Sequence, residues 1–272
     1  MKKFISLFCL MALIACSSSD TEQEQIVAPE KPVETLYNEA ADALDAKQYT
    51  QAAQLFNEVE RQHPYSKWAT KAQLMAAYAA YENEDHIESI LAVDRFLRLH
   101  PGNKDVDYAL YLKALNFYNQ ISDVGRDQDM TQMAKENFEQ LLRAYPNSKY
   151  ARDAKLKLDL TQDHLAGKEM SIGRYYLVRN QYHAATKRFL NVVREYQTTT
   201  HTPEALHRLV ESYLSLGIRA EAVRIAAILG FNYPGSVWYE DTYKLLDDSE
   251  RAQLLDDRGF VDKTMESLFR PE

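Results

Sequence analysis

The sequence has very little cysteine and glycine, and it carries no excess of basic residues. Its two cysteines, Cys9 and Cys16, both lie near the start, so the rest of the chain can form neither a disulfide nor a cysteine metal site. Only 8 of the 272 residues are glycine, which suits a helical body. The formal net charge of −8 argues against nucleic-acid binding, because phosphate recognition needs a basic face. The composition therefore indicates a soluble, helical protein.

A long apolar run is also missing. The longest one, residues 4–15, has 12 residues, whereas a membrane-spanning helix needs about 20. Lys2 and Lys3 precede it, so we expect residues 1–15 to be an export signal peptide. The following Leu13-Ile14-Ala15-Cys16 resembles the bacterial lipobox, in which the cysteine is acylated and the peptide is cut before it. That resemblance implies a lipid (palmitate-type) anchor on Cys16; the alternative is an ordinary secretory signal with an incidental cysteine.

The residues after Cys16 indicate where such an anchor would lie. Ser17 stands where the bacterial sorting pattern has an aspartate for retention in the inner membrane, which implies the outer membrane and its periplasmic face. Several acyl chains hold a protein firmly on a membrane. Residues 16–32 then form the lipidated cysteine and a polar, flexible tether.

A short turn sequence recurs five times. Each copy follows a helical run and supplies a ring, a helix-stopping residue and a small polar residue. Proline ends a helix because it lacks an amide proton, and a following Ser, Asn or Thr can cap the next helix. The copies begin at His63, His100, Tyr145, Tyr196 and Tyr233, at intervals of 37, 45, 51 and 37 residues. This spacing predicts a helical solenoid.

Small and large apolar residues precede these turns at helical spacing. They are Ala52, Phe56 and Val59 before the first turn, and Ala185, Phe189 and Val192 before the fourth. Steps of four and three place such residues on one helix face. The pattern resembles the tetratricopeptide repeat (TPR), a helix–turn–helix unit of about 34 residues. We therefore predict an all-α TPR solenoid of about five units.

The turns divide the chain into segments. Units 1–3 are expected over residues 33–149 and units 4–5 over residues 150–234. Residues 235–272 form a helical extension, with helices near 238–246 and 250–269, that caps the last apolar face. Residues 122–129 interrupt the third unit as a connector. The leading helix of the fourth unit is either two runs, 150–165 and 168–179, or one helix continuous across Gly167.

No catalytic, cofactor or metal pattern stands out. The glycines are isolated, so no phosphate-binding loop is present. Asp123, Asp127 and Asp129 around Gly125 resemble a calcium loop but lack its closing glutamate, which favours a solvated connector. The seven histidines lack metal-ligand spacing, and we expect them on surfaces or in turns. We predict a protein that is not an enzyme and uses no cofactor.

Two surfaces are candidates for partner binding. Tyrosines are abundant, 18 in all, and Tyr78, Tyr81, Tyr108 and Tyr111 fall on the first helices of units 2 and 3. First helices line the concave face of such arrays, so these rings could form a groove for an extended peptide. The alternative is packing between repeats.

The second candidate is a basic patch around Arg188, on the outer side of its helix beside the inward-facing Phe189. The patch also includes Lys187, Arg194, Arg174 and Arg179. The alternative here is an ordinary solvated face.

Residues 10–234 also resemble the BamD (ComL-type) family of outer-membrane assembly lipoproteins. The most specific stretches are Asp94 to Pro101 with Val106-Asp107-Tyr108, Tyr145 to Tyr150, and Tyr175-Tyr176 followed by Tyr182 and Ala184-Ala185. The resemblance implies a non-catalytic, lipid-anchored periplasmic scaffold of the outer-membrane β-barrel assembly (Bam) complex. The connector at 120–129 is shorter than in the family form, and the extension 235–272 is longer than in compact members.

The same resemblance implies partners. In the family, the C-terminal half docks the periplasmic POTRA domain of a BamA-type β-barrel subunit and the companion Bam lipoproteins. The N-terminal half engages unfolded outer-membrane proteins. The family's arginine for the barrel-subunit contact matches Arg188, so Arg188, Lys187 and Arg194 are the expected partner-binding residues. A guanidinium suits bidentate pairing with a carboxylate.

Two other functions compete with this one. A TPR lipoprotein of the same build could act as an adaptor that recruits cell-wall enzymes in division, and selective capture of such enzymes would favour it. A hydrolase with its site in residues 235–272 has little support, since no catalytic pattern lies there.

Overall fold

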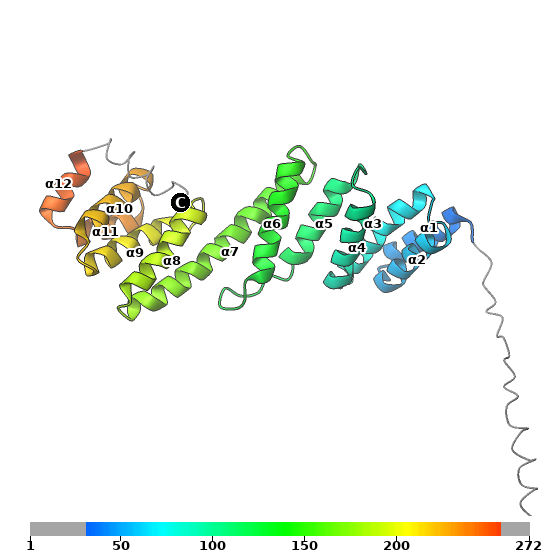
Figure 1. The fold of residues 1–272 in the computed structure, drawn as a ribbon, viewed down its shortest axis with the longest axis horizontal. Helices are drawn as coiled ribbons and strands as arrows, with labels where there is room; N and C mark the ends of the chain where they lie inside the picture. Colours follow the sequence, from blue (N-terminus) through cyan, green and yellow to red (C-terminus); the bar gives the residue numbers. More distant parts are fainter. Residues whose placement is uncertain (1–30, 257–272) are drawn as a thin grey trace, which may run out of the picture. The chain divides into compact units, whose positions relative to one another are not determined.

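The computed structural model describes residues 31–256, and within them the chain is helical, with helices α1 to α12 and no strand (Figure 1). The chain divides into Met1–Pro32 and a compact unit, Val33–Glu272, which holds all of these helices. The predicted signal peptide, the lipidation at Cys16 and nearly all of the tether lie outside the described residues. So does the extension beyond residue 256.

The helices pack as five consecutive hairpins, each against the next. The pairs are α1 (Val33–Asp45) with α2 (Tyr49–Gln62), α3 (Lys67–Glu82) with α4 (His86–Leu99), α5 (Val106–Tyr118) with α6 (Asp129–Ala144), α7 (Ala151–Val178) with α8 (Tyr182–Glu195), and α9 (Thr202–Ser215) with α10 (Arg219–Asn232). Helices α11 (Val237–Leu245) and α12 (Asp248–Asp256) follow. The predicted all-α TPR array of five units is confirmed.

The core of each hairpin follows the small–large pattern of the sequence. Phe56 and Phe189 are fully buried, as are Ala52 and Ala185 one turn before them, because a small residue lets the neighbouring helix approach the ring. At the C-terminal end, α11 packs on α9 and α10, and Leu246 joins the same apolar cluster. The described part of the extension thus caps the last repeat, as predicted.

Helix α7 is one continuous helix of 28 residues. Of the two alternatives for the fourth unit, the continuous helix is correct. No proline interrupts the helix. At Gly167 the helix passes close to the α8–α9 turn, and a Cβ there would lie 3.2 Å from His201 Nε2. Glycine costs helix stability, and this crossing explains its place.

The turns confirm the expected capping only in part. Ser66 Oγ accepts the Ala69 amide hydrogen bond at 3.0 Å, and Ser236 Oγ accepts that of Trp238 at 3.2 Å. Helices α5, α7 and α9 begin without a side-chain cap. At the third turn the Ser148 hydroxyl donates to Asp107 on α5 at 2.6 Å, and its oxygen accepts the Tyr150 amide at 3.2 Å. Asn103 and Ser148 accept the amides of Asp105 and Tyr150, the residues just before α5 and α7, so at these turns the polar residue bonds one position ahead of the predicted cap.

One buried polar cluster joins α3, α4 and α5. Asn116 is fully buried; its amide nitrogen donates to Ser89 Oγ at 2.8 Å and to Leu112 O at 2.9 Å, and its oxygen lies 3.0 Å from His86 Nδ1. Ser89 Oγ in turn donates to Ala77 O at 2.8 Å. These bonds satisfy polar groups that would otherwise be costly to bury, so the cluster fixes the register of units 2 and 3.

Candidate functional site

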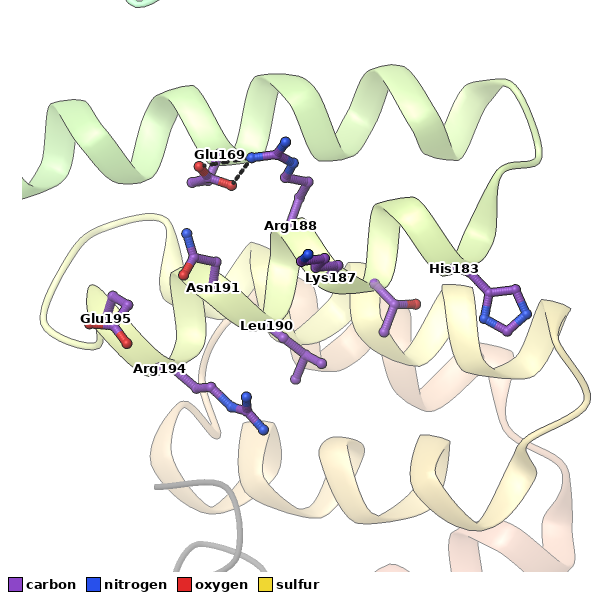
Figure 2. Close-up of a pocket in the computed structure, with 9 residues that line it drawn as sticks. Glu169, His183, Lys187, Arg188, Leu190, Asn191, Arg194 and Glu195 are labelled. Carbon is purple, nitrogen blue, oxygen red and sulfur yellow. Dashed lines mark hydrogen bonds and ion pairs between the residues drawn. The ribbon is translucent and has the colours of Figure 1, made fainter. Parts of the chain in front are cut away.

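A groove of about 530 Å³ runs over the outer face of α8 and reaches α7 at one edge (Figure 2). It contains all three predicted partner-binding residues: Lys187 and Arg194 are exposed and Arg188 is half-buried. Figure 2 shows Arg188 projecting from α8 towards α7, while Arg194 projects from the opposite edge of α8. A partner that contacts all three cations must therefore lie across α8.

Arg188 is already paired within the chain. Its Nη1 lies 3.2 Å from each carboxylate oxygen of Glu169 on α7. The arginine side chain is 39% exposed and the glutamate 16%, so the pair sits at the border of the groove rather than in bulk solvent. Arg188 is therefore a partly exposed, ion-paired residue rather than a fully solvated one. A partly exposed pair of this kind contributes about 0–1 kcal/mol to stability, so it can exchange for a partner's carboxylate.

The repeat pattern makes Arg188 unusual. It stands nine residues before Gln197, the residue that takes the place of the turn proline in unit 4. In the other units the same position holds Leu55, Ala92, Asn137 and Ile225, all half-buried or buried. A charged residue at a position that other units use for packing favours a role outside the repeat core. Comparing the five units position by position would have found this signal in the sequence.

The wider basic patch does not exist as predicted. Arg174 forms a two-pronged contact with Glu204 on α9, Nε to Oε1 at 2.9 Å and Nη2 to Oε2 at 2.5 Å. Burial tends to raise the Glu204 pKa, but Arg174 and Arg208 outweigh it and hold the pKa below its usual range. Arg179 lies over the Tyr175 ring, 3.7 Å from its centroid. Arg174 and Arg179 thus make their contacts outside the α8 groove. The patch at the groove consists of Lys187, Arg188 and Arg194.

The four predicted tyrosines form a half-buried aromatic row, which Tyr150 extends. Tyr78 and Tyr81 stack on α3 with centroids 6.4 Å apart, and Asn119 Nδ2 donates to the Tyr81 hydroxyl at 2.9 Å. Tyr108 and Tyr111 on α5 lie 5.3 and 4.9 Å from the Tyr150 ring. All of them pack partly on the core of units 2 and 3, so they serve the repeat packing and still present ring surface.

The hydroxyls of Tyr78, Tyr108 and Tyr111 stay protonated at any physiological pH. Burial, followed by a hydrogen bond to Glu82, raises the pKa of Tyr78 to about 12. Burial also raises the pKa of Tyr108, and burial together with a hydrogen bond to Asp153 raises that of Tyr111. The row therefore offers ring faces suited to apolar side chains, while the hydroxyl protons of Tyr78 and Tyr111 are already donated to Glu82 and Asp153.

Sequence reasoning missed the structural role of His207. His207 was expected on a surface or in a turn, but it is buried at 6% exposure and its Nδ1 lies 2.8 Å from Thr242 Oγ1. Its ring lies 5.3 Å from that of Trp238 on α11. The imidazole thus joins α9 to the capping helix. Thr242 is far along the chain, so no local pattern could indicate the pairing.

The described residues contain no group of three or more histidine, cysteine, aspartate or glutamate side chains placed to hold a metal ion. Across the same residues, no helix combines the length and the apolar character that crossing a bilayer requires.

The family model and the curated relatives agree on one family. A family model described as "YfiO: Outer membrane lipoprotein" matches residues 29–228. The chain is 47% identical over 245 residues to the outer membrane protein assembly factor BamD of Caulobacter vibrioides, covering 90% of this chain and 80% of that one. It is 45% identical over 246 residues to the protein of the same name from Rickettsia prowazekii, covering 90% and 96%. Among solved structures, the TPR domain of P58(IPK) aligns over 87% of this chain and 64% of that one, with 15% identity and a TM-score of 0.41.

Proposed function

The chain belongs to the outer membrane lipoprotein family, and from this premise we propose that it is a non-catalytic scaffold in the assembly of outer-membrane proteins. Its relatives at 47% and 45% identity carry the name outer membrane protein assembly factor. A TPR array suits this role because stacked helical hairpins present long, rigid binding surfaces. In this proposal the protein acts in the Bam complex at the periplasmic face of the outer membrane, held there by a lipid on Cys16.

The α8 groove is the proposed docking site for the barrel subunit. Its ligand is the periplasmic POTRA domain of a BamA-type protein, with a partner carboxylate on Arg188 and further acidic contacts on Lys187 and Arg194. The observation that carries this proposal is the placement of Arg188: it occupies a position that the other units use for packing, and it borders an open groove with two more cations. A guanidinium at the edge of such a groove can form charge-assisted hydrogen bonds with a carboxylate.

The tyrosine row is the proposed surface for unfolded outer-membrane proteins. Tyr78, Tyr81, Tyr108 and Tyr111 present half-buried ring faces on neighbouring helices, as an extended chain with apolar side chains requires. Companion Bam lipoproteins would bind the C-terminal units.

Charge reversal at Arg188 tests the docking site. In a two-component titration with the POTRA domains of the barrel subunit, we expect Arg188→Glu to weaken binding by about 2–5 kcal/mol, because the new carboxylate repels the partner and leaves its acid unpaired. Arg143→Glu is the matched control: Arg143 on α6 also pairs with a glutamate, Glu139 at 3.3 Å, but lies outside the groove. Equal affinities for the two variants would remove Arg188 from the interface.

Affinity purification of the tagged protein from gently solubilised membranes tests the function itself. A stoichiometric outer-membrane β-barrel with periplasmic domains is the expected partner. Recovery of cell-wall enzymes without such a barrel would overturn the assembly role and support the adaptor alternative.

A further inference from the structure

The seam between α5 and α7 carries a continuous series of side-chain contacts that begins at the tyrosine row. Tyr111 stacks on Tyr150 with 4.9 Å between the ring centroids, and its hydroxyl donates to Asp153. Further along, the Lys157 ammonium lies 5.9 Å from the centroid of the Tyr118 ring. The positions 150, 153 and 157 are three and four residues apart, so they share one helical face of α7.

The next positions on that face, Leu160 and His164, line a hollow of about 760 Å³. Its apolar side is formed by Tyr118 at the end of α5, by Ile121 and Val124 of the connector, and by Leu160. Its polar side includes His164 and His201. The hollow therefore continues the seam beyond the aromatic row.

Both walls of the hollow are held by hydrogen bonds. On one side, Lys168 of α7 donates to the carbonyl oxygens of Gly125 and Arg126 at 3.1 and 3.0 Å, which fixes the connector against the helix. On the other side, Asp163 accepts hydrogen bonds from the Thr200 amide at 3.0 Å and the Thr200 hydroxyl at 2.7 Å, which fixes the α8–α9 turn. These contacts within the chain hold both walls of the hollow in place.

Two features of the hollow point to a ligand that is both apolar and hydrogen-bonding. Leu160 is 60% exposed although three other apolar residues line the same space. His164 Nε2 is buried and has no hydrogen-bond partner among the described residues. Leaving a buried polar atom unpaired costs about 1–3 kcal/mol. A polypeptide supplies an apolar side chain and a backbone hydrogen-bonding group side by side. The first could cover Leu160 and the second could pair with His164 Nε2.

The distances along α7 suit an extended chain. Residues 150 and 164 are 14 apart, which at about 1.5 Å per residue is about 21 Å of helix. An extended strand advances about 3.3 Å per residue, so about six residues would reach from the Tyr150 ring to His164.

We propose that this hollow is a second binding site for an unfolded outer-membrane polypeptide. An extended segment leaves the tyrosine row at Tyr111, follows the seam, and places an apolar side chain against Leu160 and Val124 and a backbone group at His164 Nε2. The inference rests on the proposed function, because it names where the same substrate continues beyond the tyrosines. It also gives the connector a role as a wall of the site.

A matched pair of leucine substitutions tests the site. The probe is a fluorescently labelled outer-membrane β-barrel protein, unfolded in urea and diluted into a titration with the full-length protein. Leu160→Asp should weaken binding about tenfold, because it removes apolar contact and adds an unpaired charge. Leu91→Asp is the control, since Leu91 on α4 is also 60% exposed but lies outside the seam, and its affinity should stay unchanged.

A photoreactive benzoylphenylalanine at each of the two positions gives a second readout. Cross-links to the probe from position 160 but not from position 91 support the site. If Tyr111→Ala weakens binding while Leu160→Asp does not and position 160 forms no cross-link, the hollow is overturned and the tyrosine groove stands. If neither substitution weakens binding, the proposed substrate surface is overturned as well.

Discussion

The ring of Phe189 occupies the space that a side chain on Gly173 would need. A Cβ on Gly173 would lie 2.8 Å from the Cδ1 and Cζ atoms of Phe189, far inside the usual contact distance of about 3.5 Å between carbons. The contact of Gly173 with Phe189 sets the separation of α7 and α8. Gly173 lies one helical turn after Glu169, and Phe189 directly follows Arg188. The geometry of the Arg188–Glu169 pair therefore depends on a glycine.

Gly173→Ala should lower the free energy of unfolding by about 1–3 kcal/mol, because the added methyl group overpacks a fully buried contact. Urea unfolding followed by circular dichroism measures the change. Gly235→Ala is the control, since a Cβ there would meet nothing within 4 Å. Equal midpoints for the two variants would contradict the proposed role of the crossing.

The stability should depend on pH through His207. Burial, reinforced by Arg208, lowers the pKa of this histidine below its ordinary 6.5. Between 6.5 and the lower folded-state pKa the unfolded chain binds the extra proton, so stability is full above about pH 6.5 and falls as the pH drops through this window. Thermal unfolding at stepped pH should show this decline. His207→Gln should flatten it, whereas replacement of the exposed His183 by Gln should leave the decline as in the unmodified protein.

Glu169→Gln should tighten the proposed docking of the POTRA domains several-fold. Arg188 then no longer has to exchange an internal carboxylate for the partner's, and an exposed pair of this kind contributes about 0–1 kcal/mol. Glu195→Gln is matched in charge and lines the same groove, but Glu195 makes no ion pair among the described residues. If both variants tighten binding equally, the cause is net charge rather than the release of Arg188.

Asn116→Ala should lower the free energy of unfolding by about 2–3 kcal/mol, because it breaks the hydrogen bonds to Ser89 and Leu112 and leaves buried groups unpaired. The measurement is again the urea midpoint. Asn119→Ala, at the exposed end of the same helix, loses one bond to Tyr81 and should cost well under half as much. Similar costs for both would show that the buried cluster does not fix units 2 and 3.

The repeat architecture could be predicted because its information is local. Proline and polar residues mark each turn, and Ala52, Phe56 and Val59 show the packed face of a helix at a spacing visible within eight residues. The long α7 was less certain, because Gly167 interrupts the helical pattern locally and only the close approach of His201 explains it. Turns and helix faces can be predicted because the residues that determine them are close together in the sequence.

The partners of charged residues could not be predicted in the same way. Arg174 and Arg188 look alike from spacing, yet one reaches Glu204 on α9 and the other Glu169 on α7. Side-chain pairs between helices depend on how the helices pack, so the predicted patch of five cations became a groove with three. For the same reason the second bond of Ser148, to Asp107 on α5, could not be read from the sequence.

The continuous helix α7 also sets the distance and the rotation angle between the two proposed binding surfaces. Asp153 contacts the tyrosine row and Glu169 contacts Arg188, 16 residues apart on one hydrogen-bonded rod, or about 24 Å at about 1.5 Å per residue. Because the rod has no break, this spacing is set by residue count alone, and so is the rotation about its axis. One inserted residue between them would turn one surface by about 100° relative to the other. A chain held at the tyrosines is therefore presented to the partner at α8 at a constant distance and angle.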